Sequence, residues 1–80
     1  MTLSITTQTT LDKEIQICEL WLVTNTRKLK NIKRGRTTYS YKHQVERYTN
    51  YYIHEDSFIQ ACKNLGYKIS KNNEINLSII

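Results

Sequence analysis

The 80-residue chain contains no proline and only two glycines, Gly35 and Gly66. Disordered segments are usually rich in proline and polar residues and poor in large apolar ones. Here 39% of the residues are hydrophobic and 10% are aromatic, and no internal repeat or low-complexity tract is found. The composition therefore predicts a single small folded domain over residues 1–80.

No stretch approaches the roughly 18 consecutive apolar residues that read as a membrane-spanning helix. Residues 1–10 also lack the basic start and the long apolar run of a secretory signal. We therefore expect a cytoplasmic protein with no membrane partner.

Cysteine is scarce, because Cys18 and Cys62 stand 44 positions apart and form no Cys-x-x-Cys pattern. Both lie in apolar-periodic segments, where a thiol packs as a small hydrophobic group. A disulfide between the two cysteines stays an alternative, but two cysteines without a secretory signal fit a protein of a reducing compartment better. With His43 and His54 the cysteines supply zinc-type ligands, yet the gaps of 24, 10 and 7 residues lack closely spaced pairs. We expect no metal and no cofactor.

Acidic residues are few and unevenly placed. Seven acids stand against twelve lysines and arginines, for a net charge of +5. Residues 27–36 hold six basic side chains and no acid, whereas residues 1–26 hold three acids and one lysine. Because electric fields are screened within about 8 Å at physiological salt, clustered cations act together on a polyanion. The segment indicates a polyanionic partner or, alternatively, a surface that keeps a small protein soluble.

Apolar periodicity predicts three helices, at residues 11–24, 39–50 and 55–65. Gly66 stands where a left-handed cap would end the third helix. Alternating apolar residues predict a C-terminal β-hairpin, with strands at 67–70 and 74–79, and a short N-terminal strand at Leu3, Ile5 and Thr7. We interpret 27–36 as a basic loop or extended segment. The expected fold class is α+β.

The predicted helix faces define a candidate core. Its expected members are Leu11, Ile15, Cys18 and Leu22 from the first helix, Tyr41, Val45, Tyr48 and Tyr52 from the second, and Phe58, Cys62 and Leu65 from the third. Further apolar residues widen the first helix, namely Ile17, Leu20, Trp21 and Val23. We therefore expect this helix to be central to the core.

Cations and tyrosines follow one another closely in the middle of the chain. Arginine and lysine neutralise phosphates, and a tyrosine ring can stack on an unpaired base. The candidate partner-binding residues are Arg27, Lys28, Lys30, Lys33, Arg34, Arg36, Tyr39, Lys42, His43, Arg47 and Tyr51. Tyr39 and Tyr51 are the preferred stacking residues, because they lie off the apolar stripe.

Two other patterns point to different functions. Ala61 with Leu65-Gly66 resembles the first helix and turn of a helix-turn-helix, although the residues after Gly66 alternate like a strand. His43 and Glu46, at i and i+3, can meet as a base and its orienting acid. No nucleophile elbow or phosphate loop accompanies them, and an exposed Lys42–Glu46 pair beside a surface histidine explains the same residues. We expect no enzyme.

The run Thr38-Tyr39-Ser40-Tyr41-Lys42-His43-x-x-Glu46, continued by Tyr52-Ile53, Phe58-Ile59-x-Ala61 and Gly66-Tyr67, resembles a run in short proteins of phages, plasmids and integrative elements. It covers about 30 of the 80 residues. Its signature positions here are Tyr39, Lys42, His43 and Glu46. The chain departs at Glu55-Asp56-Ser57, where smaller uncharged residues are expected. The resemblance implies a mobile-element accessory protein, a group whose members often act by stoichiometric binding, anti-CRISPR inhibitors among them.

These observations predict a non-enzymatic binding protein acting in the cytoplasm of a bacterial host. We expect residues 27–36 to engage a polyanionic partner, either a host nucleoprotein effector complex or nucleic acid. The expected effect is anti-CRISPR-like inhibition of a nucleic-acid-directed defence complex. The alternative is a direct DNA- or RNA-binding regulator with a degenerate helix-turn-helix.

Overall fold

In a computed structural model, the structure describes residues 10–80. These residues form helices α2 (Thr10–Asn25), α3 (Thr38–Thr49) and α4 (Glu55–Asn64) and strands β1 (Thr26–Thr37) and β2 (Glu74–Ile79). The strands form an antiparallel two-stranded sheet, so the α+β class is confirmed. The strand expected at Leu3, Ile5 and Thr7 lies outside the described residues. No helix within 10–80 is long and apolar enough to cross a membrane.

The three helices begin and end within one residue of their predicted bounds, because their end signals are local. The Thr37 hydroxyl accepts the Ser40 N–H at 3.4 Å and caps the start of α3. At the end of α4, Gly66 has φ +87°. The Gly66 N–H donates to the Lys63 carbonyl at 3.1 Å and the Tyr67 N–H donates to the Cys62 carbonyl at 2.9 Å. This is the left-handed glycine cap that the sequence predicted.

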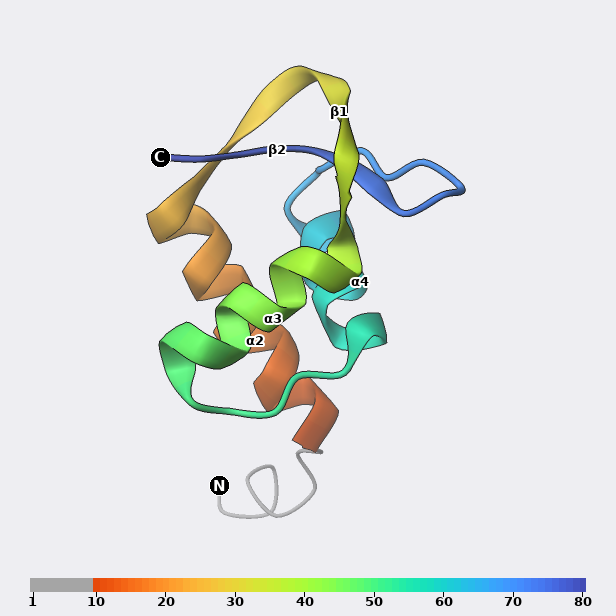
Figure 1. The fold of residues 1–80 in the computed structure, drawn as a ribbon. Helices are drawn as coiled ribbons and strands as arrows, with labels where there is room; N and C mark the ends of the chain where they lie inside the picture. Colours follow the sequence, from red (N-terminus) through yellow and green to blue (C-terminus); the bar gives the residue numbers. More distant parts are fainter. Residues whose placement is uncertain (1–9) are drawn as a thin grey trace.

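The basic segment is a strand, so of the two conformations expected for 27–36 the extended one is observed and the loop is corrected. β1 pairs with β2 at Thr26↔Ile79, Arg27↔Ser78 and Lys28↔Leu77, and again at Lys33↔Ile75 and Thr37↔Glu74. Residues 29–32 thus face only Asn76, and residues 34–36 face no residue of β2. Surplus residues of this kind bulge and bend a strand. Figure 1 shows the result: β1 forms an arch, and the top of this arch lies on the side of β2 away from the helices.

The second strand of the predicted C-terminal hairpin is β2, with the predicted bounds, whereas residues 67–70 pair with it only through an isolated bridge. The Ser70 N–H donates to the Glu74 carbonyl at 2.9 Å, and Ile69 forms an isolated bridge with Ile75. The main partner of β2 is β1 rather than residues 67–70. Because Gly66 leads into the turn before β2 and not into a helix, the helix-turn-helix of the alternative interpretation lacks its second helix.

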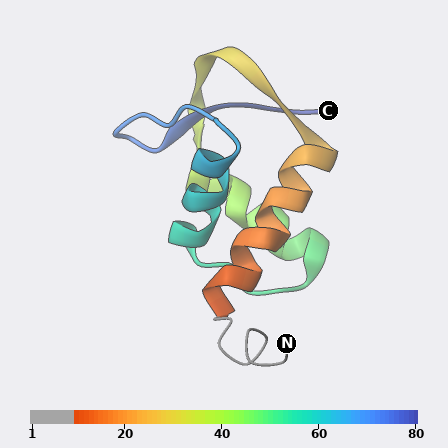
Figure 2. The same ribbon diagram turned by 180° about the vertical axis from the view of Figure 1, so that it is seen from behind.

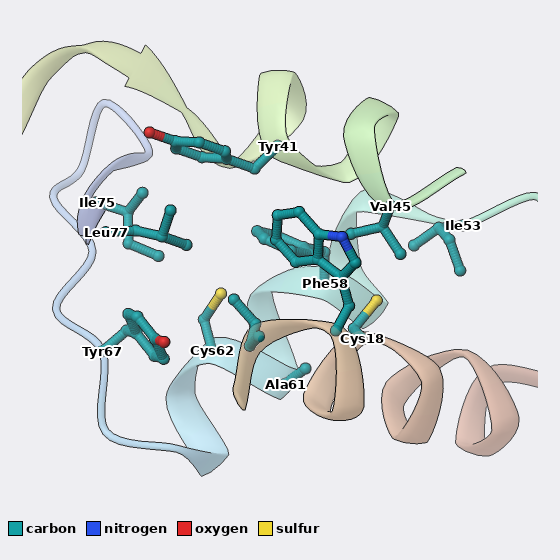
Figure 3. Close-up of a cluster of buried hydrophobic side chains, with 12 residues drawn as sticks. Cys18, Tyr41, Val45, Ile53, Phe58, Ala61, Cys62, Tyr67, Ile75 and Leu77 are labelled. Atoms are coloured by element: carbon teal, nitrogen blue, oxygen red, sulfur yellow. The ribbon is translucent and has the colours of Figure 1, made fainter. Parts of the chain in front are cut away.

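The core lies between the helices and the inner face of the sheet (Figure 3). α2 and α4 lie side by side in both ribbon views (Figures 1 and 2). The fully buried side chains include Cys18, Leu22, Val45, Ile53, Phe58, Cys62, Ile75 and Leu77. Three expected core residues are instead exposed, namely Leu11, Tyr48 and Tyr52. Leu11 and Tyr48 lie in the terminal turns of their helices and Tyr52 lies beyond the end of α3, so the apolar spacing does not bring their side chains to the core.

Both cysteines are buried and free, as expected for packed hydrophobic groups. Burial raises the pKa of Cys18 to about 12, helped by the negative charges of Glu14 and Glu19. Burial also raises the pKa of Cys62 well above its ordinary value. Because thiolates are the reactive form, these protonated thiols are chemically inert.

Candidate functional site

Strand β1 carries the exposed cations of the basic segment. We call the surface that they form the basic arch and define it by Arg27, Lys28, Lys30, Lys33, Arg34 and Arg36, all of which are exposed. Within residues 10–80, the following side chains make no hydrogen bond or ion pair: Arg27, Lys30, Lys33 and Arg34. The basic arch therefore presents charge to solvent, as the sequence predicted.

The basic arch is held in shape by side chains of β2. Asn76 is buried, and its amide nitrogen donates to the Leu29 carbonyl at 2.8 Å, while its oxygen accepts the Lys68 N–H at 2.7 Å. The Glu74 carboxylate accepts the Gly35 N–H at 3.1 Å. These bonds satisfy backbone groups where the ladder is interrupted. The two bulges are thus pinned, and the cations stand on a defined backbone.

Two members of the basic arch also contact the protein. The Lys28 ammonium donates to the Leu65 carbonyl at 2.9 Å, at the end of α4, and lies 5.7 Å from the Tyr67 ring centre. A cation there is favoured by the helix dipole, so Lys28 has a structural role. The Arg36 guanidinium lies 5.9 Å from the Tyr41 ring centre. Within residues 10–80, five cations of the basic arch thus keep their side-chain hydrogen-bond donors free: Arg27, Lys30, Lys33, Arg34 and Arg36.

Lys42 does not belong to this surface, which corrects its assignment to partner binding. Only 6% of its side chain is exposed, and its ammonium lies 3.0 Å from Glu46 Oε2. The same ammonium lies 5.4 Å from the Tyr39 ring centre and 5.0 Å from that of Tyr52. A buried lysine with these partners is part of the framework.

Glu46 collects three contacts at the end of α3. His43 Nδ1 lies 2.9 Å from its Oε1, as the i, i+3 spacing predicted, and the Ile53 N–H donates to its Oε2 at 2.9 Å. Burial alone would raise the pKa of Glu46, but the Ile53 N–H, Lys42 and His43 together lower it below its ordinary value. Both oxygens are engaged, so the carboxylate ties the 50–54 connection to α3.

Glu14 is an important residue that the sequence analysis did not single out. It is buried on α2, and its Oε1 accepts the His54 N–H at 2.8 Å, while His54 Nδ1 lies 3.0 Å from both oxygens. The Ser57 side chain also hydrogen-bonds to it. A carboxylate at the start of α4 acts as a cap from another helix. In the sequence, this role is indicated only by the position of Glu14 beside the apolar stripe of the first helix, where an acid must find a partner if it is buried.

The two carboxylates predict how stability depends on pH. Burial alone would raise the pKa of Glu14, but its bonds to His54 and Ser57 lower it. Because Glu14 and Glu46 both have a pKa below the ordinary 4.5, their contribution is complete above that pH and is lost as the pH falls below it. We expect Glu14→Gln to lower the free energy of unfolding by about 1.5–3 kcal/mol at pH 7.

Urea titrations at pH 3–7 check this prediction. The native protein should lose stability steeply below pH 4.5, and Glu14→Gln should lose less over the same range. An equally steep loss in Glu14→Gln would show that other groups govern acid unfolding.

The remaining predicted residues lie on α3 and in the segment after it. Tyr39 is exposed and meets the His43 ring edge-on, with 4.5 Å between ring centres. Tyr51 lines a groove between α2 and the end of α3. Arg47 lines an adjoining hollow with Asn25 and Ile79, and Ile79 pairs with Thr26 at the start of β1. Arg47 therefore lies near the start of β1, and Tyr51 lies in the groove that adjoins this hollow.

The candidate zinc ligands are not gathered by the fold. Within residues 10–80, no three side chains among His, Cys, Asp and Glu come close enough to hold a metal ion. Cys18 and Cys62 lie in the core, while His43 and His54 are bound to Glu46 and Glu14. Comparison of the chain with protein-family models, with curated proteins and with solved structures found no match.

Proposed function

We propose that this protein binds the backbone of nucleic acid through the basic arch and acts without catalysis. The observation that carries the proposal is the set of five cations with free donors on a pinned strand. Guanidinium and ammonium groups presented in this way replace the counterions of phosphates. The contacts of Glu46 with His43, Lys42 and the Ile53 N–H suit a framework role that holds the 50–54 connection.

The unbroken run of cations along one strand, with no acid among them, favours nucleic acid over an acidic protein surface. Residues 27–36 carry their charges along one continuous strand, which bulges and bends over β2. Nucleic acid presents a line of negative charge, one phosphate per roughly 1.7 Å of duplex. A two-stranded antiparallel ribbon is also a shape that the major groove of DNA admits.

The resemblance to mobile-element proteins supplies the biological setting of the proposal. A binding protein in the cytoplasm of a bacterial host can inhibit a nucleic-acid-directed defence complex by occupying the strand which that complex must bind. This mode of inhibition is stoichiometric and requires affinity alone.

The helix-turn-helix alternative is not carried forward. Helix α4 leads through Gly66 into a turn, so no recognition helix follows it. The exposed side chains of α4 include Asp56, Gln60 and Lys63, which together carry no excess of positive charge.

Fluorescence anisotropy with labelled oligonucleotides tests the proposal. At about 0.1 M salt we expect dissociation constants in the range of roughly 10⁻⁶–10⁻⁴ M, typical of backbone binding, with no cleavage of the oligonucleotide. Polyglutamate of equal charge is the matched competitor. Equal affinity for polyglutamate would assign the basic arch to acidic proteins, and no binding of either polymer would reject the proposed function.

A further inference from the structure

An aromatic groove lies beside the basic arch, along α2 and the end of α3. Its central part has a volume of about 330 Å³ and is lined by Ile17, Leu20, Trp21, Thr24, Tyr48, Thr49 and Tyr51. One end continues past Gln16 to Lys13, and the other continues past Gln44 to Arg47 and Ile79. We call this continuous feature the aromatic groove.

The tyrosines of the aromatic groove present their rings to solvent. Tyr48 is 71% exposed and Tyr51 is 61% exposed. Leu20, on the facing helix, is 65% exposed. Exposed aromatic rings beside an apolar wall are stacking surfaces for the flat faces of unpaired bases.

The charges around the aromatic groove have one sign. None of the lining residues is acidic, and the two charged ones are Lys13 and Arg47, at opposite ends. From Lys13 to Asn25 the groove follows α2 for about 18 Å. Cations at both ends and aromatic rings between them suit a short single strand of nucleic acid, whose phosphates can contact the cations while its bases face the rings.

The Arg47 end of the aromatic groove lies close to the start of the basic arch. Arg47 and Ile79 line the same hollow, Ile79 pairs with Thr26, and Arg27 follows Thr26 in β1. A strand that leaves the basic arch at Arg27 therefore passes Arg47 as it enters the groove.

We propose that the aromatic groove receives unpaired bases, with stacking on Tyr48 and Tyr51, so that the protein prefers single-stranded nucleic acid to duplex. This inference rests on the proposed function, because the basic arch supplies the backbone contacts. Duplex can use only the basic arch, since its bases are already paired and stacked.

The single tryptophan provides a readout that is specific to the groove. Trp21 is the only tryptophan in the chain and lines both the central part and the Arg47 end. A 15-nucleotide oligothymidylate is expected to change the Trp21 fluorescence. A 15-base-pair duplex of mixed sequence is expected to leave it unchanged while still raising the anisotropy of a labelled probe.

Two double variants separate stacking from other contributions. Tyr48→Ala/Tyr51→Ala should weaken oligothymidylate binding by at least about tenfold, since each stack is worth roughly 5- to 150-fold in affinity. The same variant should leave duplex binding within twofold of the native value, which also shows that it is folded. Tyr48→Phe/Tyr51→Phe keeps both rings and should retain the native preference.

Different results overturn this inference and the proposed function. Equal binding of single strand and duplex by the native protein and by Tyr48→Ala/Tyr51→Ala would reject the aromatic groove as a base site while leaving the basic arch in place. A change in Trp21 fluorescence with an acidic amphipathic peptide but not with oligothymidylate would assign the groove to a protein partner. A change that depends on protein concentration alone would assign it to a second copy of this chain. Failure to bind either nucleic acid would instead reject the proposed function.

Discussion

Replacing Arg34 and Arg36 together with glutamate is expected to weaken nucleic-acid binding more than 60-fold at about 0.1 M salt. Each phosphate contact changes log affinity by about 0.9 for every tenfold change in salt. Two phosphate contacts therefore raise the affinity about 60-fold when the salt concentration falls from 1 M to 0.1 M. The variant loses this gain, and its two added negative charges also repel the phosphates. Both side chains lie in the second bulge of β1, where no residue of β2 faces them.

The same variant should remain folded. Arg34 has no partner within the described residues, and Arg36 loses only its contact with the Tyr41 ring, worth about 0.5–1 kcal/mol at an exposed site. Thermal unfolding followed by circular dichroism should therefore show a decrease of a few degrees at most. Unfolding of Arg34→Glu/Arg36→Glu would show that these arginines build the fold rather than a contact surface.

A control of equal charge is available outside both proposed binding surfaces. Lys63→Glu/Lys71→Glu changes the net charge by the same amount and replaces two exposed lysines, one on α4 and one in the turn before β2. Its duplex affinity should stay well above that of Arg34→Glu/Arg36→Glu. Equal losses in the two variants would mean that net charge governs binding, and not the basic arch.

Leu22→Ala is expected to lower the free energy of unfolding by about 2–5 kcal/mol. Leu22 is fully buried in the core between the helices and the sheet. Its truncation leaves a cavity that the neighbouring side chains can fill only in part. A domain of this size is stable by about 4–12 kcal/mol, so the loss is a large share of the total.

Leu20→Ala is the matched control for Leu22→Ala. It removes the same atoms from the same helix, but Leu20 is 65% exposed. Its change in stability should lie within about 0.5 kcal/mol, as for other surface substitutions. Urea denaturation of the two variants measures the difference. Equal effects at both positions would contradict the placement of α2 against the core.

The helices could be predicted because their signals are short-range. Apolar spacing, the Thr37 cap and the Gly66 turn all act within a few residues, and the bounds agree with the structure. β1 could not be predicted, because its cations do not alternate with apolar residues. Its backbone is held by Glu74 and Asn76, which lie about forty residues later in the chain.

The candidate site could be predicted only in part. Exposure of the residue 27–36 cations followed from their charge, since lysine and arginine are rarely buried. Lys42 is the exception, and its burial depends on Glu46 and on a ring from beyond the helix end, that of Tyr52. The aromatic groove arises because the small fold leaves one side of α2 uncovered, so that Leu20 and Val23 are exposed although the apolar width of this helix had indicated a central place in the core.

The salt dependence of duplex binding tests the central claim most directly. Five phosphates neutralised by the free cations of the basic arch give a slope of log affinity against log salt near −4.5. Arg34→Glu/Arg36→Glu should reduce its magnitude to about 2.7, because two contacts are lost. A native slope close to zero, or a slope that this variant leaves unchanged, would contradict the assignment of the basic arch as the contact surface.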